Sequence, residues 1–210
     1  MDRDIDIPEQ PLTGRGDSAS KPFDVVALAS SAGGLTALST VLGALPGNFP
    51  VAVVIVQHLD PRHRSLMADI LSRRTPLKVK QAEEGETLRP GTVYVAPPDR
   101  HLLVNSDGTL SLTQSMLVRF VRPSADLLFE SVAASYRDRA IAVVLSGSGS
   151  DGAMGAQAIK KMGGTVIAQD EATAEFPGMP SAVIKTRSVD FILPLHEIAP
   201  ALVALIRGER

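Results

Sequence analysis

The sequence predicts an α/β fold with a doubly wound, mostly parallel sheet, helices on both faces and a small β-hairpin. From residue 23 onward, short apolar runs alternate with segments of helical spacing. Uninterrupted apolar runs are typical of parallel strands that are covered on both faces. Alternating apolar residues on either side of Asp107 and Gly108 predict an antiparallel hairpin at 101–113.

Each predicted element has its own local signal. Strands are predicted where apolar residues run together, at 23–29, 49–57, 92–97, 140–146, 165–169 and 189–194. Helices are predicted where apolar residues recur at helical spacing, at 34–45, 64–73, 124–136, 153–162 and 195–206. Ser124 is a predicted N-cap, and Gly163 with Gly164 a predicted helix end. The segment 175–183, which reads EFPGMPSAV, is predicted to be a loop.

Length and composition limit the class of protein. The chain has 210 residues, a hydrophobic fraction of 44% and a net charge of −2, which predict one domain with a sizeable core and no nucleic-acid partner. The absence of cysteine excludes disulfides and thiolate chemistry. No run approaches the roughly 18 consecutive apolar residues that span a bilayer. Because the N-terminus also lacks the apolar centre of a signal peptide, we expect a cytoplasmic protein without membrane insertion.

Two regions differ in composition. Residues 1–22 are polar and contain Pro, Gly, Asp and Ser throughout, so we expect a disordered tail there. Residues 23–210 contain every predicted strand and helix and are expected to form the single folded domain.

Polar residues follow three of the predicted strands. Ser30 and Ser31 end the first strand, His58 ends the second, and Asp151 follows the strand at 140–146. The carboxyl ends of parallel strands meet at one edge of a sheet, which is where such folds bind ligands. A serine hydroxyl needs a base to become nucleophilic, and that base needs a partner to fix its tautomer. The sequence therefore predicts a hydrolytic site with Ser30 or Ser31, His58 and Asp151.

The turn after Ser31 supplies a further part of such a site. The backbone N–H groups of Ala32, Gly33 and Gly34 open the next helix, where they can stabilise an oxyanion. The turn is not the G-x-S-x-G elbow of α/β-hydrolases, because Ala29 stands in place of the first glycine.

Other interpretations of these residues stay open. Small residues such as these serines are also typical of close helix–strand contact, and Asp151 stands where a helix N-cap belongs. The turn is also a candidate phosphate site. His58, Asp60 and His63 include zinc-ligand types, although Pro61 breaks the helix that would align them. The remaining histidines, His101 and His196, are expected to be surface or capping residues.

Several motifs resemble those of the CheB family of chemotaxis receptor methylesterases. The family's Ser-Thr-Gly-Gly turn corresponds to Ser31-Ala32-Gly33-Gly34, and its Gln-His pair to Gln57-His58. Its Gly-Met-Gly-x-Asp-Gly loop corresponds to 147–152, and the likeness runs from Asp24 to Ile206. The resemblance covers the catalytic domain, and we expect no receiver domain in this chain.

The resemblance implies a function and a set of site residues. It implies hydrolysis of glutamyl γ-methyl esters on the cytoplasmic helices of methylated chemoreceptors. Without a receiver domain, three alternatives stay open: regulation by another means, constitutive activity, or action beside a separate regulatory protein. Ser31 would be the nucleophile, His58 the general base and Asp151 its orienting carboxylate. Ala32, Gly33 and Ser148 would supply backbone N–H groups to the oxyanion. No metal or other cofactor is expected.

Two departures from the family pattern leave a second function open. Ala32 replaces a threonine, so a nearby hydroxyl is lost. Ser148 replaces a methionine, which keeps the backbone donor but alters the pocket wall. The alternative to an esterase is a catalytically altered regulatory or docking module of a chemosensory pathway.

Overall fold

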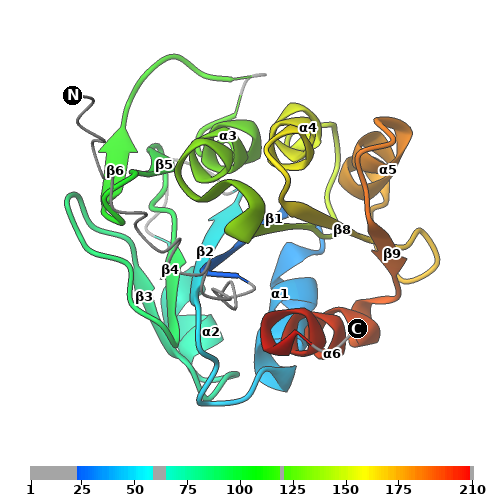
Figure 1. Ribbon diagram of the computed structural model, residues 1–210, viewed down its shortest axis with the longest axis horizontal. Helices are drawn as coiled ribbons and strands as arrows, with labels where there is room; N and C mark the ends of the chain where they lie inside the picture. The colour runs from blue at the N-terminus through cyan, green and yellow to red at the C-terminus, as the bar shows by residue number, and fades with distance from the viewer. Residues whose placement is uncertain (1–22, 59–64, 119–120, 209–210) are drawn as a thin grey trace, which may run out of the picture.

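The described part of the chain folds around one seven-stranded parallel sheet with helices on both faces (Figure 1). The structure is a computed structural model that describes residues 23–58, 65–118 and 121–208. The strand order is β3-β4-β2-β1-β7-β8-β9, and β5 and β6 form a separate antiparallel pair. The predicted fold class is confirmed, and so is the hairpin.

The sheet strands occupy short, mostly apolar segments. Their bounds are β1 Val25–Ser30, β2 Ala52–Gln57, β3 Lys78–Gln81, β4 Thr92–Val95, β7 Ala140–Val144, β8 Thr165–Gln169 and β9 Phe191–Leu193. The hairpin consists of β5 His101–Val104 and β6 Leu110–Thr113. The central strands β1, β2 and β7 are buried along their whole length, as continuous apolar runs predict.

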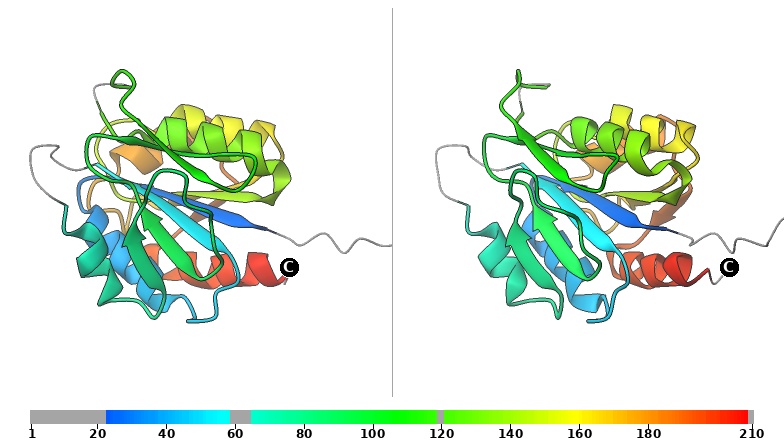
Figure 2. Two further views of the ribbon diagram at one scale, coloured as in Figure 1. Left: turned by 90° about the vertical axis from the view of Figure 1, so that its left-hand side faces the viewer. Right: turned by 60° about the vertical axis from the view of Figure 1, so that its left-hand side comes forward.

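The helices form two layers, one on each face of the sheet (Figure 2). One layer contains α1 Gly34–Ala44, α2 Met67–Ser72 and α6 Leu195–Arg207, and the other contains α3 Ala125–Tyr136, α4 Ala153–Lys161 and α5 Gly178–Lys185. A short 3₁₀ turn, η1 Arg137–Arg139, follows α3. Alternate residues of β1 face the two layers: Leu28 packs with the first, and Ala27 and Ala29 pack with the second. Each layer therefore has its own apolar core against the sheet.

Two elements differ from the sequence prediction. The segment predicted to be a loop contains α5, and Pro180 lies in its first turn, where a missing N–H breaks no helical hydrogen bond. The edge strand β3 was not predicted, because its sequence KVKQ is charged and partly exposed rather than apolar.

Some sequence expectations concern residues outside the described ranges. The expected disordered tail at 1–22 lies outside them, as do Asp60 and His63 of the metal-site alternative. None of the helices in the described ranges has the length and apolar character that a membrane span requires.

Candidate active site

The site lies where β1 meets its two neighbours, at the point where the strand order reverses. From β1 the chain moves first to β2 on one side and later to β7 on the other. Ser30 and Gln57 are register partners at the ends of β1 and β2, and the His58 N–H donates to the Ser30 carbonyl at 3.1 Å. On the other side the Ser31 N–H donates to the Ser146 carbonyl at 3.0 Å. The fold thus brings Ser31, His58 and the loop after β7 to one edge, where doubly wound folds bind ligands.

The two serines have different environments. Ser30 is fully buried, and its hydroxyl donates to Gln57 Oε1 at 2.6 Å. The Gln57 amide in turn donates to the carbonyls of Ser31 and His58 at 2.8 and 3.0 Å. Ser31 is partly exposed, and its Oγ makes no hydrogen bond to any residue that the structure describes, His58 included. Ser31 is therefore the serine whose hydroxyl is presented, while Ser30 and Gln57 hold the strand ends together.

The turn after Ser31 depends on two glycines. Gly33 has a φ of +72° and is the N-cap of α1, a conformation that L side chains rarely adopt. At Gly34 a Cβ atom would lie 2.0 Å from Gln57 Oε1 and 2.8 Å from Ser30 Oγ. Within the described ranges the N–H groups of Ala32 and Gly33 have no acceptor, whereas the Gly34 N–H donates to the Ser31 carbonyl at 2.9 Å. Two of the three N–H groups predicted from the turn are thus available to a ligand beside Ser31.

The loop after β7 closes the site on the other side. A Cβ atom on Gly147 would lie 2.9 Å from Ser31 Cβ and 2.3 Å from the sulfur of Met179, so only glycine fits there. The Gly147 N–H donates to the Phe176 carbonyl at 2.8 Å. Ser148 follows it, is exposed, and has an N–H without an acceptor among the described residues. Ser148 directly follows Gly147 in the chain, and Gly147 is the residue that packs against Ser31.

The close approach at Gly34 gives a first prediction. Gly34→Ala should displace the Gln57 amide, because the new methyl group cannot share the space of Oε1. We expect the free energy of unfolding to fall by about 1–3 kcal/mol and the reactivity of Ser31 to fall with it, since Gln57 holds the carbonyls of Ser31 and His58. Thermal denaturation and the rate of fluorophosphonate labelling measure the two effects. Gly47→Ala is the control for an added methyl group, because Gly47 has no positive φ and a Cβ there would meet only the Pro76 side chain, at 3.4 Å; equal loss in both variants would contradict the prediction.

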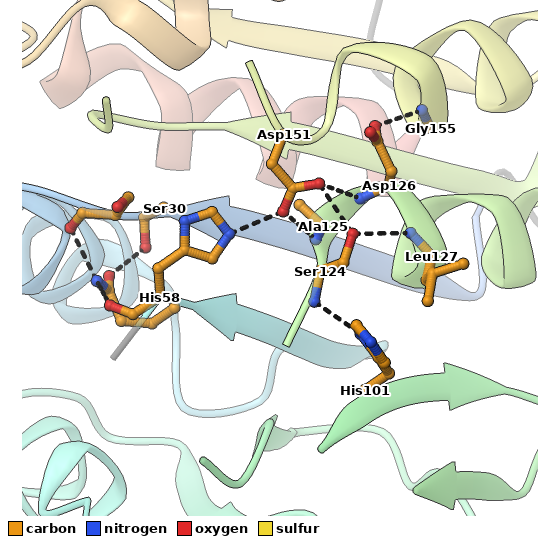
Figure 3. A network of polar contacts seen from close by, with 11 residues as sticks. Ser30, His58, His101, Ser124, Ala125, Asp126, Leu127, Asp151 and Gly155 are labelled. Carbon is orange, nitrogen blue, oxygen red and sulfur yellow. Dashed lines mark hydrogen bonds and ion pairs between the residues drawn. The ribbon is translucent and has the colours of Figure 1, made fainter. Parts of the chain in front are cut away.

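His58 and Asp151 form a close, largely buried pair. The His58 Nε2 atom lies 2.7 Å from Asp151 Oδ2, and the side chains are 14% and 4% exposed (Figure 3). An ionised carboxylate only accepts hydrogen bonds, so Nε2 carries the donated proton. In the neutral imidazole Nδ1 is then the unprotonated nitrogen.

Asp151 also lies at the N-terminus of α3. Its Oδ1 accepts from the Ser124 hydroxyl at 2.9 Å and from the Asp126 N–H at 3.0 Å. Its Oδ2 accepts from the Ala125 N–H at 2.6 Å as well as from His58. Burial alone would raise the pKa of Asp151, but the hydrogen bonds from His58 and from these N–H groups outweigh it and lower the pKa below its usual value. The carboxylate is thus held ionised beside the imidazole, in the favourable field of a helix N-terminus.

This position corrects one sequence interpretation. Asp151 stands before α4 in the sequence, where it was a candidate N-cap, but the N-cap of α4 is Gly152, which has no side-chain cap. Asp151 instead satisfies N–H groups of α3, alongside the Ser124 hydroxyl, which accepts from the Leu127 N–H as the predicted N-cap.

The histidines not assigned to the site have contrasting positions. His196 is mostly exposed, as expected. His101 was expected at the surface or at a cap and is fully buried, with its Nδ1 atom accepting from the Ser124 N–H at 3.1 Å. The sequence gives no signal for this, because the contact depends on how the hairpin packs against α3.

Comparisons with known proteins identify the family of this chain. Residues 26–202 match the family model described as CheB methylesterase. A Leptospira interrogans relative, provisionally assigned as a protein-glutamate methylesterase/protein-glutamine glutaminase, is 42% identical over 87% of this chain and 95% of its own length. A Moorella thermoacetica protein-glutamate methylesterase/protein-glutamine glutaminase is 43% identical over 89% of this chain, which spans only 45% of that relative. The crystal structure of the Thermotoga maritima CheB methylesterase catalytic domain superimposes with a TM-score of 0.84 at 39% identity, covering 87% of this chain and 98% of that one. With the family model matched over most of the described residues, the chain belongs to the CheB methylesterase family.

Proposed function

We propose that this chain is a serine hydrolase that cleaves glutamyl γ-methyl esters on the cytoplasmic helices of chemoreceptors, with Ser31, His58 and Asp151 as its triad. The observation that carries the proposal is the 2.7 Å hydrogen bond between His58 and Asp151 at the sheet edge that also presents Ser31. The names of the relatives, protein-glutamate methylesterase/protein-glutamine glutaminase, give the substrate class. We place the reaction in the cytoplasm, where the receptor helices lie.

The contacts of His58 support its role as general base. Since Nε2 donates to Asp151, Nδ1 is the nitrogen left to take the proton of Ser31 Oγ. No hydrogen bond joins these two groups here, and such contacts often tighten only when substrate is bound. Asp151 stays ionised throughout and stabilises the imidazolium that forms.

The reaction then has two halves. In the first, Ser31 Oγ bonds to the ester carbonyl carbon, and the resulting oxyanion accepts hydrogen bonds from the N–H groups of Ala32, Gly33 and Ser148. The carbon–oxygen bond to the methoxy group breaks, and methanol leaves with the proton held by His58. In the second half His58 takes a proton from water, the resulting hydroxide bonds to the glutamyl-enzyme carbon, and the bond to Ser31 breaks as His58 returns the proton to Ser31 Oγ. The products are the regenerated serine and a glutamic acid side chain, which loses its proton to solvent and becomes a carboxylate.

The alternative of a docking module with an altered site has less support. It rests on Ala32 and Ser148, but the proposed mechanism uses only their backbone N–H groups, which the substitutions leave in place. No contact that the mechanism requires is removed by either residue.

Methanol release tests the proposed function. Incubation of the protein with a receptor cytoplasmic fragment that carries glutamyl methyl esters should release one methanol and leave one new carboxylate per site, which gas chromatography and mass spectrometry measure. If a fluorophosphonate modifies Ser31 but no methylated receptor is hydrolysed, the proposed substrate is wrong and the serine hydrolase remains. If neither reaction occurs, the docking module is the correct interpretation.

A further inference from the structure

The buried imidazole of His101 has a hydrogen bond at each nitrogen. Nδ1 accepts from the backbone N–H of Ser124 at 3.1 Å, and Nε2 lies 3.2 Å from the carbonyl of Met116. A backbone N–H can only donate and a carbonyl can only accept. Together they require the neutral tautomer with its proton on Nε2, because a proton on Nδ1 would face the N–H of Ser124.

The position of His101 relates it to Asp151. Ser124 and the two residues after it supply three donors to the Asp151 carboxylate, namely the Ser124 hydroxyl and the N–H groups of Ala125 and Asp126. Figure 3 shows the resulting chain of contacts, from His101 through Ser124 to Asp151 and on to His58. The imidazole thus fixes the backbone at the residue where this set of donors begins.

The charges around His101 are consistent with a neutral ring. Burial lowers its pKa, and the Arg122 guanidinium acts in the same direction. The hydrogen bond to the Met116 carbonyl and the negative charges of Asp151 and Asp99 act in the opposite direction but do not outweigh burial. The ring therefore keeps its acceptor toward Ser124 at the near-neutral pH where an esterase of this kind would work.

We propose that His101 is a positioning residue of the esterase: by holding the first turn of α3 through Ser124, it sets the position of Asp151 and thereby the orientation of His58. This inference rests on the proposed function. His101 does not touch the reacting atoms, and it acts only through the backbone of Ser124.

The Nε2 atom of His101 contacts an exposed loop, and so connects that loop to Ser124. Met116 is 88% exposed and Leu117 is 52% exposed, and both follow β6. Arg122 fixes this loop by donating to the carbonyls of Gln114 and Ser115 and to the Asp99 carboxylate. The imidazole therefore links this loop to the first turn of α3. A substitution at His101 can remove one of its two hydrogen bonds and keep the other.

Two amide substitutions separate them. Asparagine places its Oδ1 where His101 has Nδ1, so His101→Asn keeps an acceptor for Ser124 and loses the bond to Met116. Glutamine places its Nε2 where the imidazole has Nε2, so His101→Gln keeps the bond to Met116 and loses the acceptor. We expect His101→Gln to lower kcat for methanol release by up to about 10²-fold, since a misplaced catalytic group costs that much, with KM unchanged. His101→Asn should restore most of the loss.

A purely structural role would give a different pattern. Both variants replace the same buried ring by an amide, so simple loss of packing would lower kcat and the melting temperature alike in the two. Equal kcat in His101→Asn and His101→Gln, or a wild-type kcat in His101→Gln, would overturn the proposal. If the wild-type protein releases no methanol at all, the proposed function has failed rather than the role of His101.

A measurement on the unsubstituted protein covers the case in which a variant does not fold. The ¹⁵N chemical shifts of a histidine report its tautomer and its protonation state. We expect His101 to give the shifts of a neutral ring protonated at Nε2 throughout the pH range of activity. An Nδ1-protonated or cationic ring in that range would overturn the proposal, because neither can accept from Ser124.

Discussion

Ser31→Ala is expected to abolish ester hydrolysis and fluorophosphonate labelling while leaving the fold intact. Removal of the serine from a comparable triad lowers kcat by about 10⁶-fold, because no other group takes over the attack. The cost in stability should be small, since Ser31 Oγ makes no hydrogen bond to the described residues. Methanol release and mass spectrometry of the labelled protein measure the two losses.

Ser30→Ala is the matched control for this change. It removes the same hydroxyl one residue earlier, where the group is buried and donates to Gln57 Oε1. We expect it to lower the free energy of unfolding by about 1–3 kcal/mol, the cost of leaving a buried acceptor unpaired, and still to be labelled at Ser31. Labelling of Ser31→Ala at Ser30 would show that the nucleophile had been assigned to the wrong serine.

Asp151→Asn is expected to lower kcat by about 10⁴-fold, as the loss of the carboxylate does in a comparable triad. The negative charge that stabilises the His58 imidazolium is removed. In either orientation the new amide group also places its own N–H toward a backbone donor, that of Ala125 or that of Asp126. The pH profile of methanol release measures the effect on catalysis. A chemical denaturation curve measures the free energy of unfolding, which should fall by about 1–3 kcal/mol.

Asp126→Asn is the control for the loss of charge. It also removes one negative charge, from a residue of α3 that lies beside Asp151. Its carboxylate accepts from the Gly155 N–H at 2.9 Å, a bond that an asparagine oxygen can keep, and its side chain makes no hydrogen bond to His58. Activity should stay within an order of magnitude of the wild type. A loss as large as that of Asp151→Asn would mean that net charge near the site, rather than the contact with His58, determines the rate.

The sequence predicts those features of the site that follow from strand ends. Ser31, His58 and the loop containing Asp151 each follow a buried strand, and a parallel sheet must bring such ends to one edge. Ser124 is recognisable as an N-cap from its place before a helical pattern. These signals are local or follow from topology, so no side-chain packing had to be known.

The features that could not be predicted depend on packing between distant segments. His101 becomes buried because β5 packs against α3, and nothing in its own strand indicates the Ser124 contact. Asp151 accepts from the N–H of Ala125 in α3, which lies 26 residues earlier in the chain. It does not cap the helix that follows it. The helix α5 was missed for a different reason, since Pro180 and Gly178 are typical of loops but are also tolerated in a first helical turn.

The contacts of Asp151 with both the His58 imidazole and the N-terminus of α3 have an evolutionary consequence. Because the same carboxylate orients an imidazole and satisfies the start of a helix, selection for folding alone would retain it after catalysis had been lost. The ring of His58 has no comparable structural role, so a substitution of His58 would be tolerated in such a descendant. An inactive descendant of this fold would therefore be recognised by a changed histidine beside a preserved aspartate, and the survival of the aspartate alone would be no sign of an enzyme.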